Sequence, residues 1–297
     1  MTAQSRFVPE VSVVIAEAAG QSDPAPTLQS VAAACAGIAA EVILVRPAGR
    51  ARLSVMPGLP LQEINSPVGA LVPIQWGHGI EASSGKWVAC LSTELLVAPS
   101  WARTLAGLTA DRVAGVAGAL AIPHRVPAIS SALHLLRFAP FLPQEPAAAQ
   151  EVADLPGEGA WYLREEILRH RDLLDNGFWE VEFHRRFARD GFRLLFTREP
   201  LVAYAPAMSL AAAAHLRYIH GYGHGTTRVL RHHDNKLRIL GLAPLVPGVL
   251  IARIFRKSGR TRGARREFAR SLGPLLVLTA AWALGEARGA LAAGSQR

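Results

Sequence analysis

The stretch "KWVACLSTELLVAPSW", residues 86–101, decides the fold prediction. A short apolar run at residues 87–91 ends in a polar group at residues 92–94, before a second apolar patch and Pro99. An apolar run bounded by polar residues is typical of a buried strand. In parallel α/β sheets, ligands bind at the carboxyl ends of such strands. We therefore expect residues 92–94 to face a functional site.

Similar apolar runs occur before and after this stretch, with amphipathic segments between them. Buried strands are predicted at residues 11–15, 41–45, 86–91, 112–120 and 192–196, and helices at residues 27–36, 75–84 and 101–108. Alternation of this kind predicts an α/β fold, in which a mainly parallel central sheet is flanked by helices. The loops after Ile15, Val45 and Leu91 are then the places where chemistry is expected.

Two segments before residue 206 have distinct patterns. Residues 140–156 hold four prolines and few large apolar side chains, so a surface loop is predicted. Residues 177–191, "GFWEVEFHRRFARDG", predict a short helix that ends at Gly191. Its inward stripe is expected to consist of Trp179, Phe183 and Phe187, which are spaced four residues apart.

The character of the chain changes near residue 206, so we predict a domain over residues 9–206 and a helical region over residues 207–297. In the latter, residues 209–233 have a helical pattern that glycines interrupt. Two apolar segments, residues 239–255 and 272–294, contain proline, and neither offers about 20 uninterrupted apolar residues for a membrane span. A hairpin lying in the membrane interface is expected; a helical pair packed on the domain or at a dimer interface is the alternative.

The 297 residues are 50% hydrophobic and carry a net charge of +9. Most of the excess positive charge is one run: Arg253, Arg256, Lys257, Arg260, Arg262, Arg265, Arg266 and Arg270. This local run fits anionic lipids rather than nucleic acid, which we do not expect as a partner. Cys35 and Cys90 are expected in the core. The polar N-terminus predicts no secretory signal, so we expect the protein in the cytoplasm, peripheral on the inner face of the membrane.

From about Val11 to Tyr204, the order of the motifs resembles the family-2 glycosyltransferases, which have a GT-A fold. The likeness is carried by "VSVVIAEAA", "EVILVRPAG", "GHGIEASSGKWVACL", "PSW", "LPGEGAWYLREEIL" and "WEVEFHRRFARDGFRLLF". Farther on, "APLVPGVLIARIFR" and "AWALGEARG" resemble the membrane-hugging tails of bacterial members. The resemblance implies a nucleotide-diphosphate sugar as donor and a glycan or lipid-linked acceptor.

The family's Asp-x-Asp motif, which holds a divalent metal, corresponds to residues 92–94. Ser92 replaces the first carboxylate and Glu94 keeps the last, so Glu94 could hold Mg²⁺ or Mn²⁺ together with substrate phosphates. The alternative is a solvated acid at a strand end. The family's second-strand aspartate, which contacts the nucleotide, corresponds to Arg46. This arginine either donates two hydrogen bonds to a phosphate or is a surface residue on a loop that does not bind nucleotide. Glu17 either reaches a nucleobase or ribose or is a solvent-facing loop residue.

Glu180 corresponds to the family's catalytic base, which takes the proton of the acceptor hydroxyl. The alternative is an acid stabilised by the helix dipole. Arg217 and His220 follow the domain where the family places a cationic helix near the diphosphate. They either contact phosphate or lie on a solvated helix face, and the five histidines between residues 215 and 233 also raise a zinc cluster as an option. Gly159 stands where the family often has Asn.

Two functions follow from the resemblance. The first is an inverting glycosyltransferase that acts on a lipid-linked or polysaccharide acceptor at the cytoplasmic membrane face. The second is a catalytically impaired relative that binds a partner or glycan as a scaffold, which the loss of two family carboxylates favours.

Overall fold

The computed structural model describes residues 8–17, 23–50, 53, 58–204, 206, 208–230, 233–258 and 262–293. The chain forms two compact units. We call Met1–Ala121 with Phe141–Tyr204 the sheet unit, and Ile122–Pro140 with Ala205–Arg297 the helical unit. Residues 122–140 thus group with the C-terminal helices, although the sequence-based boundaries place them in the first domain.

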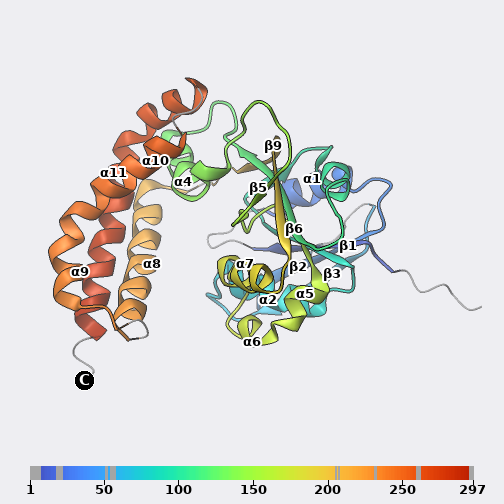
Figure 1. Ribbon diagram of the computed structural model, residues 1–297, viewed down its shortest axis with the longest axis horizontal. Coiled ribbons are helices and arrows are strands. Elements are labelled where there is room, and N and C mark those ends of the chain that lie inside the picture. Colours follow the sequence, from blue (N-terminus) through green and yellow to red (C-terminus); the bar gives the residue numbers. More distant parts are fainter. Residues whose placement is uncertain are drawn as a thin grey trace, which may run out of the picture. The chain divides into compact units, whose positions relative to one another are not determined.

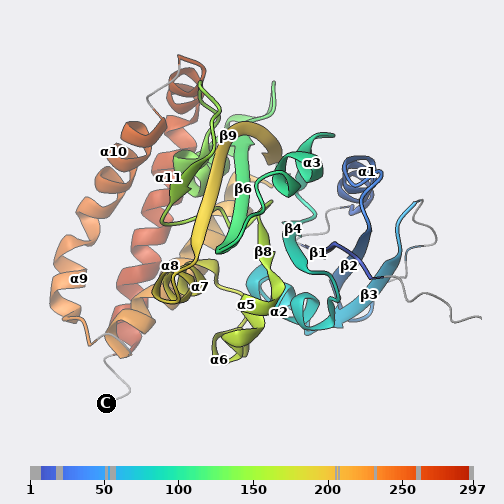
Figure 2. The same cartoon turned by 45° about the vertical axis from the view of Figure 1, so that its right-hand side comes forward.

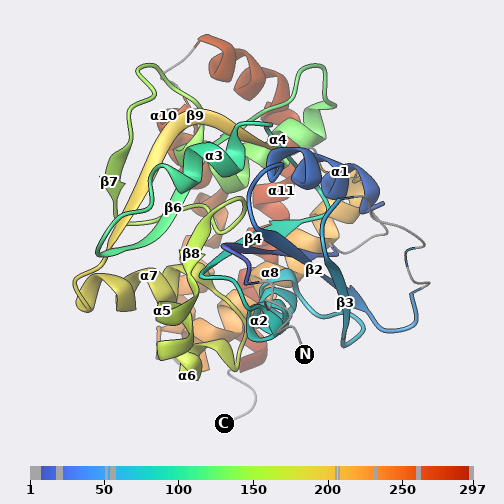
Figure 3. The same cartoon turned by 90° about the vertical axis from the view of Figure 1, so that its right-hand side faces the viewer.

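The sheet unit is built on one mixed sheet (Figure 3). Its order is β3-β2-β1-β4-β8-β6-β9-β5, and β7 pairs with β9 outside this path. The strands β1 to β4, β6 and β9 share one direction, because β4 and β6 are both antiparallel to the β8 between them. The bounds are β1 Val11–Ala16, β2 Ala40–Pro47, β3 Leu61–Ser66, β4 Trp87–Ser92, β5 Leu95–Val97, β6 Val113–Ala121, β7 Gln150–Val152, β8 Trp161–Leu163 and β9 Arg193–Tyr204.

Helices cover both faces of this sheet. The helices are α1 Ala25–Ala34, α2 Val72–Ala82, α3 Trp101–Ala106, α5 Arg164–Arg169, α6 Arg171–Leu174 and α7 Glu180–Arg189. Figure 3 shows α1 and α3 on one side and α2, α5 and α7 on the other. The core on the second side joins alternate strand residues such as Val14 and Cys90 to Ile80, Phe183 and Phe187. The predicted fold class is confirmed, because every residue of β1 and β4 is buried, as apolar runs between two helical layers require.

The helix predicted within residues 177–191 is present as α7, and Gly191 follows it at φ +78°. The predicted inward stripe is only partly right. Phe183 and Phe187 are fully buried, but Trp179 is 45% exposed. Trp179 precedes the first helical turn in extended backbone, so its side chain does not follow the helical spacing, and Phe178 fills the core in its place.

Residues 140–156 are not a simple surface loop. They contain β7, which pairs antiparallel with β9 through Gln150, Glu151 and Val152. The strand is only three residues long, so its alternating pattern is too short to predict from sequence. The segment continues through Asp154 toward the turn at Gly157.

The helical unit contains α4 Ala128–Phe138, α8 Leu210–Leu230, α9 Lys236–Leu242, α10 Val246–Ser258 and α11 Arg262–Ala293 (Figure 1). The expected interruption by proline is found in residues 239–255, where a 3-10 turn at Ala243–Leu245 separates α9 from α10. For the other two segments, the expectation that glycine or proline interrupts them is wrong. The helix α8 runs unbroken through three glycines, and α11 runs unbroken through Pro274. Packing between the helices outweighs the weak local propensity of these residues.

Two glycine pairs explain how α8 and α11 approach each other; the two helices run side by side in Figure 2. A Cβ at Gly221 or Gly225 would lie 2.1 Å from a backbone oxygen of α11. A Cβ at Gly285 or Gly289 would lie 2.1 Å from a backbone oxygen of α8. Each pair has the spacing small-x-x-x-small, which allows two helix backbones to pack closely.

The helical unit presents an exposed apolar surface. Lys236–Ser258 and Gly263–Ala293 are long and apolar enough to associate with a membrane, and most of their residues are not buried. Large exposed side chains include Leu237, Leu245, Val249, Leu276 and Leu284. From the basic run, the side chains of Arg253, Arg256, Lys257, Arg265, Arg266 and Arg270 are exposed, while Arg260 and the side chain of Arg262 lie outside the described residues.

Candidate functional site

The candidate site lies at the carboxyl ends of β1, β2 and β4 in the sheet unit. The chain passes from β1 to β2 and β3 on one side, then returns to β4 on the other side of β1. Such a change of direction makes a topological switch point, where open α/β sheets bind ligands. Ala16 pairs with Val45 on one side and with Ser92 on the other, so the segments predicted from sequence meet here.

Glu17 and Arg46 form a buried ion pair at this edge. Arg46 Nε lies 2.7 Å from Glu17 Oε2, and Arg50 Nη2 lies 2.8 Å from Glu17 Oε1. Arg46 also approaches Glu63 at 3.5 Å. The solvent-facing alternative for Glu17 and the surface alternative for Arg46 are therefore wrong. Two guanidinium groups compensate the cost of removing the carboxylate from water, which explains why Glu17 can be buried.

The turn that carries Ser92, Thr93 and Glu94 is fixed from both sides. Thr93 N donates to Ala16 O across 3.1 Å, which extends the pairing of β4 with β1. Thr27 Oγ1 on α1 lies 3.1 Å from Thr93 O and 2.8 Å from Leu95 O. Ser92 and Thr93 are buried, and Glu94 is half-buried. Glu94 is thus held at the edge of the site rather than fully solvated.

Glu158 is a carboxylate of this site that the sequence reasoning missed. It is 2% exposed, and its Oε2 accepts a hydrogen bond of 3.2 Å from Ser92 Oγ. Gly159 N donates to Cys90 O across 2.8 Å, so residues 157–160 run alongside β4 and bring Glu158 to its end. The signal in the sequence is an acid between two glycines in an otherwise apolar segment. Gly159 is required there, because its φ is +77° and a Cβ would lie 2.6 Å from Val202 Cγ2.

Glu180 lies at the first position of α7 and reaches the same segment. A Cβ at Gly157 would lie 2.7 Å from Glu180 Cδ, so the glycine leaves the space that this carboxylate occupies. Glu180 is half-buried. Burial, and then the negative charges of Glu180 and Glu158, raise the pKa of the Cys90 thiol on β4.

Arg217 and His220 lie on α8 in the helical unit. Arg217 Nε is buried and has no hydrogen-bond partner among the residues that the structure describes. Burial and the charge of Arg137 lower the pKa of Arg217 to about 10. Partial desolvation, and then the charges of Arg217 and Arg137, lower the pKa of His220, whose side chain is exposed on α8 as the solvated-face alternative expects. Repulsion among these cations would be relieved by an anion, so phosphate contact by Arg217 and His220 stays a prediction.

The side chains near the end of β4 offer oxygen ligands. Carboxylate oxygens are what Mg²⁺ and Mn²⁺ prefer, and Glu94 and Glu158 lie on the segments that meet at this end of the sheet. Within the described part of the chain, no group of three or more His, Cys, Asp or Glu side chains is placed to hold a metal ion. A divalent metal here would therefore need substrate phosphates among its ligands. Of the five histidines of the zinc option, His232 lies outside the described residues.

No protein-family model and no curated protein sequence matches this chain. Among solved structures, one that is similar is the mannosyltransferase PcManGT from Pyrobaculum calidifontis in complex with GDP-Man and Mn²⁺. It is 17% identical with a TM-score of 0.48, and the similarity covers 98% of this chain and 76% of that chain. A likeness this distant assigns neither a family nor a residue role.

Proposed function

We propose that the protein is a glycosyltransferase. It transfers a sugar from a nucleotide-diphosphate sugar to a lipid-linked or polysaccharide acceptor, with inversion, at the cytoplasmic face of the membrane. The observation that supports this most is the hydrogen bond of Ser92 with Glu158 at the carboxyl end of β4, together with the approach of Glu180 to the neighbouring Gly157. The order of motifs along the chain supports the same assignment.

In this proposal, Glu180 accepts the proton of the acceptor hydroxyl. The hydroxyl oxygen then forms a bond to the anomeric carbon, and the bond from that carbon to the diphosphate breaks. Glu94 would contribute a carboxylate oxygen to Mg²⁺ or Mn²⁺, which when bound would act as a Lewis acid on the diphosphate. On α8, Arg217 and His220 would bind a phosphate group through their positive charge. Ser92, Arg46 and Glu17 would shape the donor side of the site.

Membrane association belongs to the same proposal. The exposed leucines and valines of α9, α10 and α11 and the exposed basic side chains fit the interface of an anionic leaflet. Co-sedimentation with vesicles of phosphatidylglycerol, compared with phosphatidylcholine, tests it. We expect binding to the anionic vesicles that weakens with salt; equal recovery with and without vesicles would contradict the proposal.

A thermal-shift panel on the full chain tests donor binding. UDP-, GDP-, dTDP- and CDP-sugars are each added with Mn²⁺ and with EDTA, and one of them is expected to raise the melting temperature more with Mn²⁺. Glu180→Gln should abolish transfer and keep the donor-induced shift. Glu182→Gln, an exposed acid on the same helix, is the matched control and should keep both. Full transfer by Glu180→Gln would overturn the assignment of the base.

A second candidate is a catalytically impaired relative that acts as a binding or scaffold protein. The observation that favours it is the sequestration of Glu17 by Arg46 and Arg50, which fills the edge of the sheet with internal ion pairs. This candidate predicts that no nucleotide-diphosphate sugar in the panel shifts the melting temperature. Tight binding of any of them would exclude it.

A further inference from the structure

Arg217 lies on the inner face of α8, in a stripe whose other residues are small. Ala213, Gly221 and Gly225 are buried, and together with Arg217 they recur every four residues along the helix. Gly221 and Gly225 approach the backbone of α11 closely. The Nε of Arg217 is buried as well, and it has no hydrogen-bond partner in the described part of the chain. The stripe thus holds a cationic side chain with an unsatisfied donor.

Arg228 shows how the helical unit accommodates a second arginine of this helix face. It follows Arg217 by eleven residues, which is about three helical turns, so both side chains leave α8 on the same side. Arg228 Nη1 lies 2.8 Å from Glu286 Oε1 on α11, and Arg228 Nε lies 2.6 Å from Asp234 Oδ2. This arginine is therefore compensated by two carboxylates of its own unit.

The composition of the helical unit explains why Arg217 differs. The unit has seventeen lysines and arginines but only three acids. Two of these acids hold Arg228, and the third, Glu267, lies 3.0 Å from Arg270. A guanidinium stays charged at neutral pH, and burying it is costly unless an anion compensates it. The acids of this unit are engaged elsewhere, so the compensating anion is expected to be a ligand.

Arg137 adds a second arginine to this site from α4. It is exposed in the last turn of that helix. Ser130, about two turns earlier on the same face of α4, donates to Pro206 O across 2.9 Å, which joins α4 to the segment leading into α8. The charge of Arg137 acts on Arg217 and on the exposed His220, which is one turn farther along α8. The site therefore extends from a buried donor to cations at the surface.

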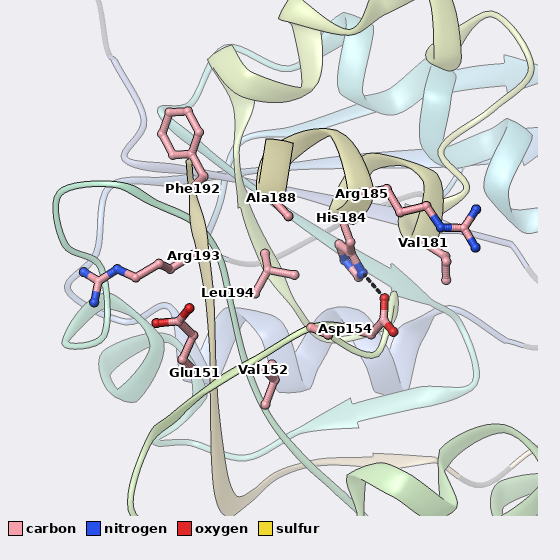
Figure 4. Close-up of a pocket in the computed structure, with 11 residues that line it drawn as sticks. Glu151, Val152, Asp154, Val181, His184, Arg185, Ala188, Phe192, Arg193 and Leu194 are labelled. Atoms are coloured by element: carbon pink, nitrogen blue, oxygen red, sulfur yellow. Dashed lines mark hydrogen bonds and ion pairs between the residues drawn. The ribbon is translucent and has the colours of Figure 1, made fainter. Parts of the chain in front are cut away.

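The pocket beside α7 in the sheet unit has a different electrostatic character. Its volume is about 620 Å³, and Figure 4 shows charged side chains of both signs around it. His184 Nδ1 lies 3.2 Å from Asp154 Oδ1 there, and Glu151 and Arg193 contribute one charge of each sign to the lining. Charges of opposite sign offset each other, so this pocket does not favour an anion as the cations around Arg217 do.

The side chains near these cations favour a lipid headgroup as the anion. Ile219 and Tyr222 are exposed on α8 beside His220. Exposed apolar residues next to cations are typical of the boundary between headgroups and acyl chains, where tyrosine is also enriched. An arginine can donate two parallel hydrogen bonds to a phosphate, which makes it suited to a phospholipid headgroup.

We propose that Arg217, with Arg137 and His220 at its entrance, binds the phosphate of an anionic phospholipid headgroup. Such a site differs from the attraction of the exposed basic run to a charged surface, because it has a buried donor for one phosphate. The inference rests on the proposed membrane association, and it does not depend on sugar transfer.

Co-sedimentation of the full chain with vesicles of phosphatidylglycerol or phosphatidylcholine tests this site. Raising NaCl from about 0.1 M to about 1 M shortens the Debye length from about 10 Å to about 3 Å, which weakens exposed cations far more than a buried contact. At the higher salt, wild type should prefer phosphatidylglycerol about tenfold. Arg217→Gln should lose this preference, while Arg253→Gln, which removes an exposed charge on α10, should keep it. Equal preference in the two variants would overturn the inference.

Melting temperatures without vesicles separate binding from folding. Arg217→Gln should melt at or above the wild-type temperature, because it removes a buried charge that no acid of the unit compensates. Arg228→Gln is the matched control on the same face of α8, and it should melt at a lower temperature because Glu286 stays buried without its arginine. If Arg217→Gln melts as low as Arg228→Gln, Arg217 is a structural residue and the inference fails.

GDP and UDP are the probes for a soluble source of phosphate. Neither should release wild type from phosphatidylglycerol vesicles at the higher salt, and release would assign Arg217 to a soluble diphosphate and overturn the lipid source. A donor-induced thermal shift without an Arg217-dependent lipid preference would refute this inference and leave the proposed transferase standing. A lipid preference that depends on Arg217, without any donor-induced shift, would do the reverse.

Discussion

The hydroxyl of Ser92 donates a hydrogen bond to Glu158 Oε2 across 3.2 Å, although 66 positions separate the two residues. Ser92 is the last residue of β4, at the position where the resemblance places the first metal-binding carboxylate. A carboxylate is therefore present beside that position in space, but it comes from the segment before β8. The loss of an acid in the motif at residues 92–94 is not a loss of acid from the site.

Replacement of Ser92 by Ala tests how strongly the site depends on this bond. Glu158 is buried, so loss of the donor should leave its carboxylate less satisfied and lower the free energy of unfolding by about 1 to 3 kcal/mol. The measurement is urea unfolding followed by tryptophan fluorescence. Ser100→Ala is the matched control, since Ser100 donates to Glu199 at a part-buried position, and it should cost less than about 1 kcal/mol. Equal losses of unfolding free energy in the two variants would show that the buried Ser92–Glu158 bond stabilises the protein no more than the part-buried bond of Ser100.

Removal of Arg46 from its ion pair with Glu17 should cost more stability than removal of the Ser92 hydroxyl. In Arg46→Met, the buried Glu17 carboxylate keeps Arg50 as its one cationic partner among the described residues, so we expect the free energy of unfolding to fall by about 2 to 4 kcal/mol. Arg171→Met removes an exposed pair with Glu81 and should cost at most about 1 kcal/mol. Chemical denaturation of both variants measures the contrast. A loss in Arg46→Met as small as that in Arg171→Met would show that Glu17 is solvated in solution.

The sheet was predictable because its strands are buried on both faces. Val13, Val14 and Ile15 are all fully buried, so their run is continuously apolar and stands out from its surroundings. The carboxyl ends of these strands then located Glu17, Arg46 and Ser92 at one edge. By contrast, β7 and β8 have three residues each, and such short runs carry too little pattern to recognise.

The partners within the site were not predictable in the same way. Glu158 meets Ser92, and His184 meets Tyr162 and Asp154, only because distant segments fold together. A sequence pattern reports the local environment of a residue, not the identity of the side chain across from it. The unbroken course of α8 was not predictable for a related reason, because the glycines that weaken this helix alone are the residues that allow it to pack on α11.

The stability of the protein should depend on pH through His184. The folded state lowers the pKa of this imidazole below its ordinary value, so the unfolded chain binds a proton more readily. The contribution is fully present above pH 6.5 and is lost as the pH falls through the lowered pKa, at about 1.4 kcal/mol for each unit of lowering. Urea midpoints of wild type and His184→Gln between pH 5 and 8 measure it. A wild-type curve parallel to that of His184→Gln would contradict this origin.

The packing of α8 on α11 predicts opposite effects for two glycines on one helix. A Cβ at Gly225 would lie 2.1 Å from Glu286 O, so Gly225→Ala should push the helices apart and cost about 1 to 3 kcal/mol. A Cβ at Gly223 would meet nothing within 4 Å, so Gly223→Ala should stabilise α8 by up to about 1 kcal/mol through helix propensity. Urea unfolding followed by circular dichroism at about 222 nm compares the two in one buffer. Destabilisation of similar size in both variants would mean that the cost arises from helix distortion and not from the contact with α11.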